Sequence, residues 1–193
     1  TPSFLSDVLD RVARAGEAFV PQGVREEVRA MLRFGRYKPS GRGKPASEFL
    51  LRAALEGAFP LVNGPVDVNN AVSLESGLPG SIFDADLSGR ALRLRRGETG
   101  ESYVFNPSGQ SIDLEDLLVV CRHVGGVWQP CGNPVKDSMA TKVHVGTTDV
   151  VAVLYAPRSE PAAVVSRWCE RFAGLLSSHC GAARTGFRVP DDA

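Results

Sequence analysis

Apolar residues in the first sixty positions recur every three or four residues, which is the spacing of one face of an α-helix. A first helix is predicted to begin at Ser6 as its cap, and a second to follow Pro21 and stop near Gly35. A polar loop at 37–45, with two Pro and two Gly, separates them from a third helix that Ser47 would cap. The N-terminal part of the chain is therefore predicted to be helical.

The segment 63–79 predicts a short fourth helix. Asn63 or Gly64 precedes it, Pro65 occupies its first position, and Gly77 ends it. Its interior holds polar residues that form helices poorly because their side chains compete for backbone hydrogen bonds, namely Asp67, Asn69, Asn70 and Ser73. Two interpretations stay open: these side chains contact a substrate, or they cap and brace the neighbouring loops.

From about residue 90 the apolar pattern alternates with a period of two, which indicates strands. Six are predicted, at 91–95, 101–105, 117–121, 124–128, 142–145 and 150–155. A last helix is expected from Pro161 to His179 with Gly181 as its cap, followed by a frayed tail at 190–193. This order of helices, strands and helix predicts an α+β fold with a largely antiparallel or mixed sheet.

The length of 193 residues suits one domain with a substantial core. We expect an N-terminal helical segment at 1–36, a core at 37–157, and a C-terminal helix and tail at 158–193. No apolar run is long enough to cross a bilayer and no secretory signal opens the chain, so a cytoplasmic protein is expected. The four cysteines have no C-x-x-C spacing, which favours reduced thiols over a zinc site.

The chain carries 22 basic and 22 acidic side chains, so a nucleic-acid partner would need a local basic surface. The segment between residues 24 and 52 contains eight basic residues and three acidic ones. The basic residues are Arg25, Arg29, Arg33, Arg36, Lys38, Arg42, Lys44 and Arg52. A solvated face is the usual meaning of such a run; a surface that tracks phosphates is the alternative.

Several kinds of chemistry are excluded or disfavoured by missing motifs. The chain has neither a G-x-x-x-x-G-K-[ST] loop nor a G-x-S-x-G elbow. Its histidines, His123, His144 and His179, are far apart in sequence, so neither a metal nor a cofactor is expected. Among them His144 is the one worth testing, because it lies in a second polar segment at 134–149.

That segment supplies amine, carboxyl and hydroxyl groups between predicted strands. Its polar residues include Lys136, Asp137, Ser138, Thr141, Thr147 and Thr148. If it lines one cleft together with the polar helix at 63–79, the two could bind an amino group and orient a water.

Four ordered segments carry a family resemblance. They read KPSGRGKPASEFLLRAAL, PLVNGPVDVNNAVSLESGLPGSIFDAD, LRLRRGETGESY and KDSMATKVHVGTTDVV. From about Lys38 to Pro157 the chain resembles the B3/B4 editing domain of the phenylalanyl-tRNA synthetase β subunit, and more closely its free-standing relatives. GPVDVNNAVSLESGLP with the following FDAD is the specific part of the match.

The resemblance implies a three-layer fold of packed β-sheets with helices, and a pocket that hydrolyses the ester of a wrongly charged tRNA. Asn70 matches an Asn that lines that pocket, and Asp137, with Ser138, falls about where the synthetase has a Glu that recognises the noncognate amino acid. Ser81 stands where the synthetase has a His, which is a departure from the family pattern. Ligation is not implied, since nothing remains for an ATP-dependent domain.

The resulting hypothesis is a deacylase that acts in trans on mischarged tRNA and needs no metal. Its candidate catalytic residues are Asn70, Asp137, Ser81 and Thr147. Its candidate substrate-binding residues are Asp67, Ser73, Ser138 and His144. The basic loop, residues 36–44, would meet the tRNA phosphates through Arg36, Lys38, Arg42 and Lys44. Two alternatives stay open: a non-catalytic RNA- or protein-binding module, and a hydrolase of a small aminoacyl or peptidyl ester.

Overall fold

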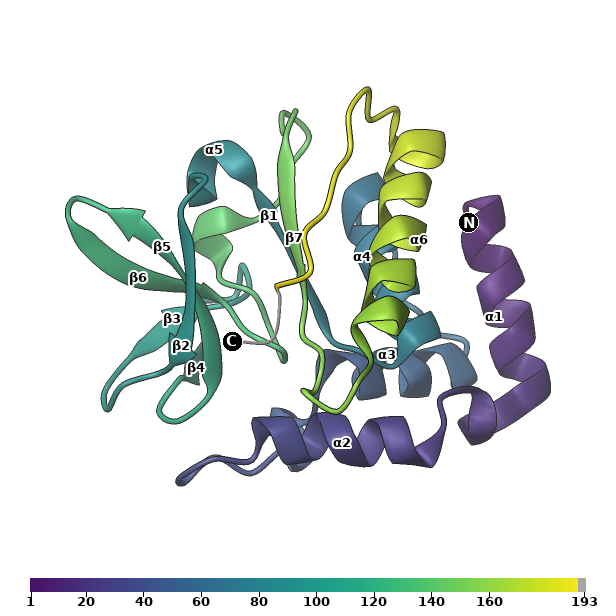
Figure 1. Cartoon of the computed structure of the whole chain (residues 1–193), viewed down its shortest axis with the longest axis horizontal. Coiled ribbons are helices and arrows are strands. Elements are labelled where there is room, and N and C mark those ends of the chain that lie inside the picture. The colour runs from purple at the N-terminus through teal and green to yellow at the C-terminus, as the bar shows by residue number, and fades with distance from the viewer. Residues whose placement is uncertain (191–193) are drawn as a thin grey trace.

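A two-stranded ribbon forms the middle of the computed structural model, which describes residues 1–190 (Figure 1). Strand β1 (Gly80–Asp84) pairs antiparallel with β7 (Val150–Leu154), so that Ser81 lies opposite Val153. Because side chains alternate along a strand, Ser81 points to one face of the ribbon and Ile82 to the other. The two faces of this ribbon pack against different layers.

A β-sheet region covers the face toward which Ser81 points (Figure 1). Its three-stranded sheet has the order β2 (Leu92–Arg96), β5 (Leu118–Val124) and β6 (Val127–Gly132), all antiparallel. A separate hairpin of β3 (Ser102–Val104) and β4 (Ser111–Asp113) lies beside it.

Helices cover the other face of the ribbon (Figure 1). The helices α4 (Gly64–Ser76) and α6 (Ala162–Cys180) contact each other, and α4 contacts β1 and β7. Outside them lie α1 (Ser3–Ala15) and α3 (Ala46–Leu55), and α2 (Gln22–Leu32) runs along one end of the molecule.

Short helical turns join several of these elements. They are α5 (Ala85–Ser88), η1 (Gly16–Phe19), η2 (Gly41–Gly43) and η3 (Met139–Thr141). The turn α5 follows β1 directly, and η3 lies in the long connection between β6 and β7. That connection, residues 133–149, carries most of the predicted site residues.

Local signals explain where α4 begins and ends. The side chain of Asn63 accepts a hydrogen bond from the Val66 backbone, Pro65 lies in the first turn, and Gly77 closes the helix in the left-handed conformation at φ 74°. Pro lacks the backbone N–H that would be unpaired at this position, and Gly adopts a positive φ without a steric penalty. The predicted fourth helix is therefore confirmed at both ends.

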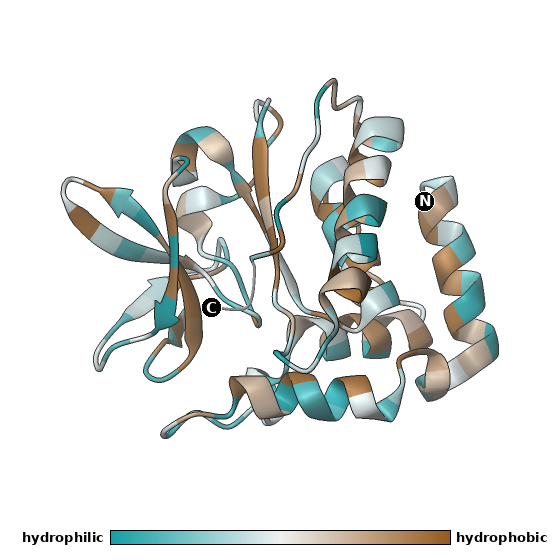
Figure 2. Ribbon diagram, in the orientation of Figure 1, coloured by the Kyte–Doolittle hydropathy of each residue, from teal (hydrophilic) through white to brown (hydrophobic). Residues whose placement is uncertain are grey.

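Two apolar layers sandwich the ribbon. Phe83 packs with Val120, Cys131 and Tyr155 on the sheet side, and Ile82 packs with residues of α4 and α6 on the helix side. Figure 2 shows β7 as an almost continuously apolar strand, whereas the helices carry both apolar and polar residues. Burial of each large apolar side chain stabilises the fold by roughly 1.5–3 kcal/mol. The ribbon is thus held from both sides.

The α+β fold with antiparallel sheets, N-terminal helices and a C-terminal helix is confirmed. The strand predicted at 142–145 is wrong: this segment is irregular, with Val143 buried and Val145 fully exposed. The strands predicted at 117–121 and 124–128 form one hairpin that turns at 125–126, so both boundaries shift. Strands β1 and β4 were not predicted.

Two predicted caps are also wrong. Ser6 lies inside α1, where its hydroxyl donates to the Pro2 carbonyl, and Ser47 is buried inside α3, which Pro45 precedes. The last helix begins after Pro161 and ends at Gly181 in the left-handed conformation, as predicted. The predicted tail at 190–193 lies, beyond Pro190, outside the described residues. No helix within residues 1–190 combines the length and apolar character needed to cross a membrane.

Candidate functional site

A chain of three polar side chains lies between the ribbon and the sheet. The Ser81 hydroxyl donates to Asp137 Oδ1 at 2.6 Å, and the Ile82 backbone N–H donates to Asp137 Oδ2 at 3.3 Å. Tyr155 Oη lies 2.8 Å from Ser81 Oγ. Because the only hydroxyl proton of Ser81 goes to Asp137, Tyr155 donates this second bond. Asp137 therefore stands at the outer edge of β1 and ends a Tyr155–Ser81–Asp137 chain.

Burial raises the pKa values of the two acidic groups in this hydrogen-bonded chain, Asp137 and Tyr155. It raises the pKa of Asp137 from 3.8 to about 6, although the hydrogen bond from Ser81 and the nearby Lys142 charge act in the opposite direction. Burial also raises the pKa of Tyr155 well above its ordinary value, so the phenol stays neutral and can donate. A carboxyl group that titrates near 6 is mostly ionised at neutral pH but remains basic enough to accept a proton.

The backbone around Asp137 is fixed by Asn133. Its side-chain oxygen accepts from the backbone N–H groups of Val135 at 2.8 Å and Lys136 at 2.9 Å, and its amide donates to Tyr103 Oη. Tyr103 in turn donates to the Lys136 carbonyl at 2.6 Å. Neither Asn133 nor Tyr103 was predicted from the sequence, since their roles depend on the docking of β3 against this loop.

Gly132 makes room for the carboxylate. A Cβ at this position would lie 2.7 Å from Asp137 Oδ1 and still closer to the Phe83 ring. Both contacts are far inside van der Waals separation, so only glycine fits the observed arrangement. The G-N-P sequence, which reads as a turn in the amino-acid pattern, is thus part of the candidate site.

The polar residues of α4 reach the ribbon one residue before Ser81. Asn69 Nδ2 donates to the Gly80 carbonyl at 3.3 Å and lies 3.4 Å from Asn70 Oδ1. Asn70 is half-buried beside this contact. Among residues 1–190 the buried Oδ1 atom of Asn69 has no hydrogen-bond partner. Asn70 thus lies near the start of β1, but no direct hydrogen bond within the described residues joins it to Asp137.

Asp67 and Ser73 are buried elsewhere on α4. Asp67 Oδ1 accepts from the Val62 backbone at 2.8 Å, and burial raises its pKa. Ser73 is fully buried, and within the described part of the chain its hydroxyl has no partner. The hydrogen bond between Val62 and Asp67 favours the interpretation in which polar residues of this helix brace a neighbouring loop. It does not bring Asp67 to Asp137.

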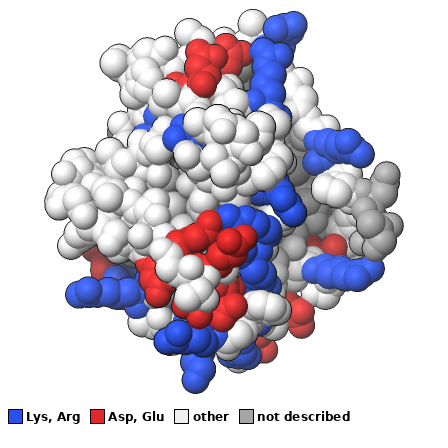
Figure 3. All heavy atoms as spheres, turned by 90° about the vertical axis from the view of Figure 1, so that its left-hand side faces the viewer, with Lys and Arg blue, Asp and Glu red and all other residues white. Residues whose placement is uncertain are grey.

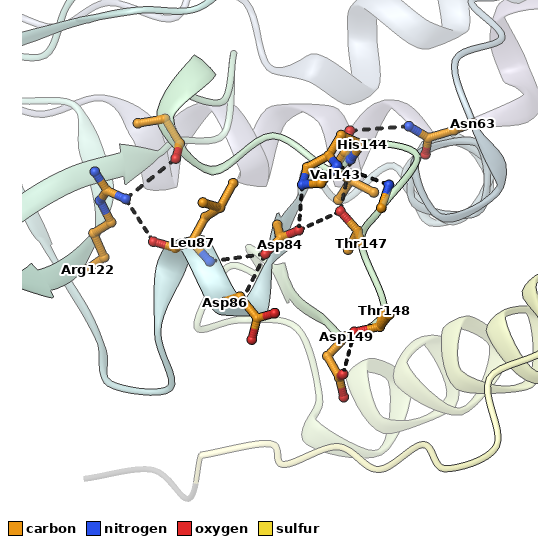
Figure 4. Close-up of polar contacts among 12 residues, drawn as sticks. Asn63, Asp84, Asp86, Leu87, Arg122, Val143, His144, Thr147, Thr148 and Asp149 are labelled. Carbon is orange, nitrogen blue, oxygen red and sulfur yellow. Dashed lines mark hydrogen bonds and ion pairs between the residues drawn. The ribbon is translucent and has the colours of Figure 1, made fainter.

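Thr147 and His144 belong to a second cluster, around Asp84 (Figure 4). Thr147 Oγ1 donates to Asp84 Oδ2, and His144 Nε2 lies 3.3 Å from the same oxygen. His144 Nδ1 accepts from the Gly146 backbone at 3.0 Å, so both ring nitrogens are engaged. The hydrogen bond from Thr147 is the main reason that the pKa of Asp84 is lowered.

This second cluster is separate from the first. Asp84 also accepts from the backbone of Asp86 and Leu87 and so caps α5, which leaves the carboxylate occupied by structural contacts. Asp84 and Ser81 lie three residues apart on β1 and therefore point to opposite faces. The predicted site residues thus fall into two clusters: Ser81 and Asp137 meet, whereas Thr147 and His144 contact Asp84. Asp84 belongs to the FDAD segment of the family match but was not among the predicted site residues.

Comparison with known proteins completes this description. The sequence model of the B3/4 domain matches residues 34–167, which include both clusters. The chain belongs to the B3/4 domain family. No curated protein matched the sequence. The resemblance drawn from the four sequence segments is therefore confirmed at the level of the family.

The basic loop of this B3/4 domain, residues 36–44, lies beside the connection that carries Asp137. The Ala46 backbone N–H, just after the loop, donates to the Pro134 carbonyl at 2.8 Å. Burial lowers the pKa of Lys136, and the positive charge of Arg42 lowers it further, which places these two cations near each other. The loop thus brings positive charge next to the residue that precedes Asp137.

The four predicted RNA-binding residues differ in their surroundings. Arg36 forms a 3.4 Å ion pair with Glu115, although its side chain is 82% exposed. Lys38, Arg42 and Lys44 are exposed, and none of them forms an ion pair within residues 1–190. The sheet side of the B3/4 domain carries separate acidic and basic groups rather than one uniform basic surface (Figure 3).

Two further observations concern the chemistry available. Within the described residues no group of three His, Cys, Asp or Glu side chains is arranged to hold a metal ion. Ser138 is buried and caps η3 through a 3.1 Å bond from the Ala140 backbone, so its hydroxyl has a structural contact next to Asp137. The group that stands out is the carboxyl of Asp137.

Proposed function

We propose that this B3/4 domain is an aminoacyl-tRNA deacylase that hydrolyses the ester of mischarged tRNA in trans, without ligase activity. The observation that carries the proposal is the contact of Ser81 with Asp137, a carboxyl group of raised pKa. The family resemblance singles out the same two residues. Asp137 is half-buried as a whole residue, and burial of its carboxyl group is what raises the pKa. Membership of the B3/4 family, which is associated with editing by tRNA synthetases, supports the proposed class of activity.

In the proposed reaction Asp137 acts as a general base. Its carboxylate accepts a proton from a water as the water oxygen attacks the carbonyl carbon of the aminoacyl ester. The tetrahedral intermediate then collapses, the bond to the ribose oxygen breaks, and Asp137 returns the proton to that oxygen. The products are a free amino acid and an uncharged tRNA. A base of pKa about 6 suits this role better than one of 3.8, because proton transfer is more favourable.

The remaining residues position the substrate. Ser81 and the Ile82 backbone hold the two carboxylate oxygens of Asp137 in one orientation, in which the carboxylate would receive the proton of the attacking water. Asn70, half-buried beside the start of β1, would hold the terminal ribose or the amino acid. Arg42 and Lys44 would meet phosphates of the acceptor stem, since the basic loop is tied to the backbone just before Asp137.

One observation favours a second candidate, a non-catalytic binding module. Ser81 is 0% exposed and Tyr155 only 3% exposed. Their hydroxyls form hydrogen bonds with each other, and that of Ser81 also bonds to Asp137. Buried polar networks of this kind also occur where their only role is to specify the fold. In that case the basic loop would bind RNA while the Asp137 cluster braces the sheet against the ribbon.

A deacylation assay separates these candidates. The purified protein is incubated with a panel of correctly and wrongly charged tRNAs, and the loss of radiolabelled aminoacyl ester is followed. The variants Asp137→Asn and Asn70→Ala are assayed beside Asp10→Asn, which changes an exposed carboxylate on α1.

For a deacylase we expect selective hydrolysis of at least one mischarged species. Asp137→Asn should lower its rate on the order of 10²-fold or more, the typical contribution of a general base. Asp10→Asn should keep the full rate. Spontaneous rates over the whole panel, together with salt-sensitive tRNA binding, would instead establish the binding module.

A further inference from the structure

A cleft of about 720 Å³ lies on the opposite side of β7 from its partner β1. One wall consists of β7 and α6, the other of β2, and the segment 182–190 forms its outer side. Figure 1 shows this segment leaving α6 and running in front of β7. None of Ser81, Asp137 and Tyr155 lines the cleft, so it is distinct from the candidate deacylase site. Its volume is in the range of sites for small organic ligands.

The inner walls of the cleft are aliphatic. Val153 and Leu154 line it from β7, and Leu176 lines it from α6. Leu94 on β2 faces the same space and is 54% exposed, an unusual degree for a leucine next to a core. Among the described residues its aromatic lining is limited to Phe172, which is buried, and Phe187 in the outer segment. Such walls fit an aliphatic body better than a run of stacked bases, which would need several exposed rings.

The rim of the cleft is positively charged. The basic lining residues Arg184 and Arg188 lie on the outer segment, and Asp149 is the one acidic residue among the described lining residues. The guanidinium of Arg93, although that residue also lines the cleft, lies over the Trp128 ring on the other face of β2. Within residues 1–190 neither Arg184 nor Arg188 forms an ion pair. A guanidinium group is well suited to bind a carboxylate with two parallel hydrogen bonds. The charge of the rim therefore selects for an anion.

The outer segment is held loosely. The last hydrogen bonds that connect it to the described structure involve Ala182, through Leu176 at 3.2 Å and Ser177 at 3.1 Å. Within the described chain, residues 183–190 are attached through side-chain packing alone. A ligand could therefore enter by displacing this segment, without breaking backbone pairing.

We propose that the cleft binds a small amphipathic anion, with an aliphatic body between β7 and α6 and a carboxylate held by Arg184 and Arg188. The combination of an aliphatic interior with rim arginines that form no ion pair within residues 1–190 carries this proposal. It does not depend on deacylase activity, because the residues of the two sites do not overlap.

Titration calorimetry with matched probes tests the proposal. Laurate has the aliphatic body and the carboxylate, dodecyltrimethylammonium has the same body with a cation, and acetate has the carboxylate alone. Laurate and dodecyltrimethylammonium are titrated below their micelle concentrations into the whole chain, and acetate over the same concentration range. We expect laurate to bind saturably at one site, and the other two probes to bind at least about tenfold more weakly, as expected for removal of one charge-assisted interaction or of the buried chain.

Variants on each wall locate the site. Ala152→Phe fills the cleft from an exposed position on β7, and Ala163→Phe makes the same change on α6 away from it. Arg188→Glu reverses a rim charge, and Arg167→Glu reverses an exposed charge on α6 outside the cleft. Ala152→Phe and Arg188→Glu should each weaken laurate binding about tenfold or more, and both controls should leave it unchanged.

Limited trypsin digestion gives an independent readout. Bound laurate should slow cleavage after Arg184 and Arg188, because the ligand holds the outer segment against β7. Equal affinity for the anionic and cationic probes, or laurate binding that survives Ala152→Phe, would overturn the proposal. Deacylation assays on the same variants distinguish the two sites. Both variants should keep the full deacylation rate, since neither substitution contacts the Asp137 cluster.

Discussion

Ser81 and Asp137 are joined by a 2.6 Å hydrogen bond across 56 residues of sequence. The hydroxyl stabilises the ionised form of the carboxyl group and so opposes the effect of burial, which raises the pKa of Asp137 to about 6. The bond thus links the position of Asp137 to its acidity.

The substitution Ser81→Ala is expected to raise the pKa of Asp137 above about 6, because it removes a donor that favours the carboxylate. In a deacylase with Asp137 as base, the midpoint of the pH–rate profile should move to higher pH by the same amount. The measurement is the deacylation rate from pH 5 to 8, corrected for spontaneous hydrolysis.

Tyr155→Phe is the matched control for this profile. It removes the bond from the phenol to Ser81 and leaves the bond from Ser81 to Asp137 in place. We expect a loss of stability of about 1 kcal/mol, typical of one hydrogen bond, and an unchanged midpoint. A midpoint that shifts equally in both variants, or in neither, would show that a different group titrates.

The second prediction concerns stability and pH. The folded protein holds the proton of Asp137 up to about pH 6, whereas the unfolded chain loses it near 3.8. The contribution of this group is therefore fully present below pH 3.8 and is lost as pH rises through about 6. Asp137→Asn should be more stable than the native protein at pH 7.5 by roughly 1–2 kcal/mol, and should have no such advantage at pH 4.

Urea unfolding at the two pH values measures this difference. Asp10→Asn, which neutralises an exposed carboxylate on α1, controls for the change in net charge. An advantage of Asp137→Asn that is equal at pH 4 and pH 7.5 would contradict the raised pKa. Gain of stability together with loss of deacylation would mean that Asp137 is kept for its chemistry rather than for the fold.

The third prediction concerns Gly132. Gly132→Ala places a methyl group 2.7 Å from Asp137 Oδ1 and still closer to the Phe83 ring, so one of them must move. We expect the free energy of unfolding to fall by about 1–3 kcal/mol, as in other overpacked cores, and deacylation to fall with it.

Gly174→Ala is the matched control. This glycine lies in α6, and a Cβ there would meet no atom within 4 Å. Alanine should stabilise the helix by about 0.5–1 kcal/mol and leave deacylation unchanged. Urea unfolding and the deacylation assay together check both substitutions. Equal effects of the two would mean that the crowding around Gly132 has no functional consequence.

Local signals explain which elements the sequence predicts well. Helix α4 is specified by Asn63, Pro65 and Gly77, all within or next to the helix itself. Strand β1, in contrast, is buried on both faces and shows no alternation, and its partner β7 lies about 70 residues later in the chain. Pattern analysis cannot detect such a strand, because its stability comes from tertiary contacts.

The same distinction applies to the candidate site. The family resemblance, rather than spacing or periodicity, singled out Ser81 and Asp137 together. The contacts of Tyr155 and Asn133 depend on how the sheet docks on the ribbon, so no local pattern reveals them. The apparent strand at 142–145 arose from apolar Val143 and Val145, which tertiary packing separates into one buried and one exposed side chain.

The last prediction concerns the basic loop. Arg42 and Lys44 are exposed and lie in the loop that is tied to the backbone before Asp137. If they bind tRNA phosphates, the double variant Arg42→Glu and Lys44→Glu should weaken tRNA binding. It should also reduce the slope of log affinity against log salt concentration by about 1 for each phosphate that the variant no longer neutralises.

Filter binding of uncharged tRNA between about 50 and 200 mM salt measures both quantities. The control is Arg14→Glu with Arg167→Glu, which makes the same change in net charge on α1 and α6. A decrease in affinity that is equal in the two double variants would indicate that only the overall charge matters. A decrease confined to the loop variant would place the phosphates at the loop, which is tied to the connection that carries Asp137. That location is required if the ester is to reach Asp137 for hydrolysis.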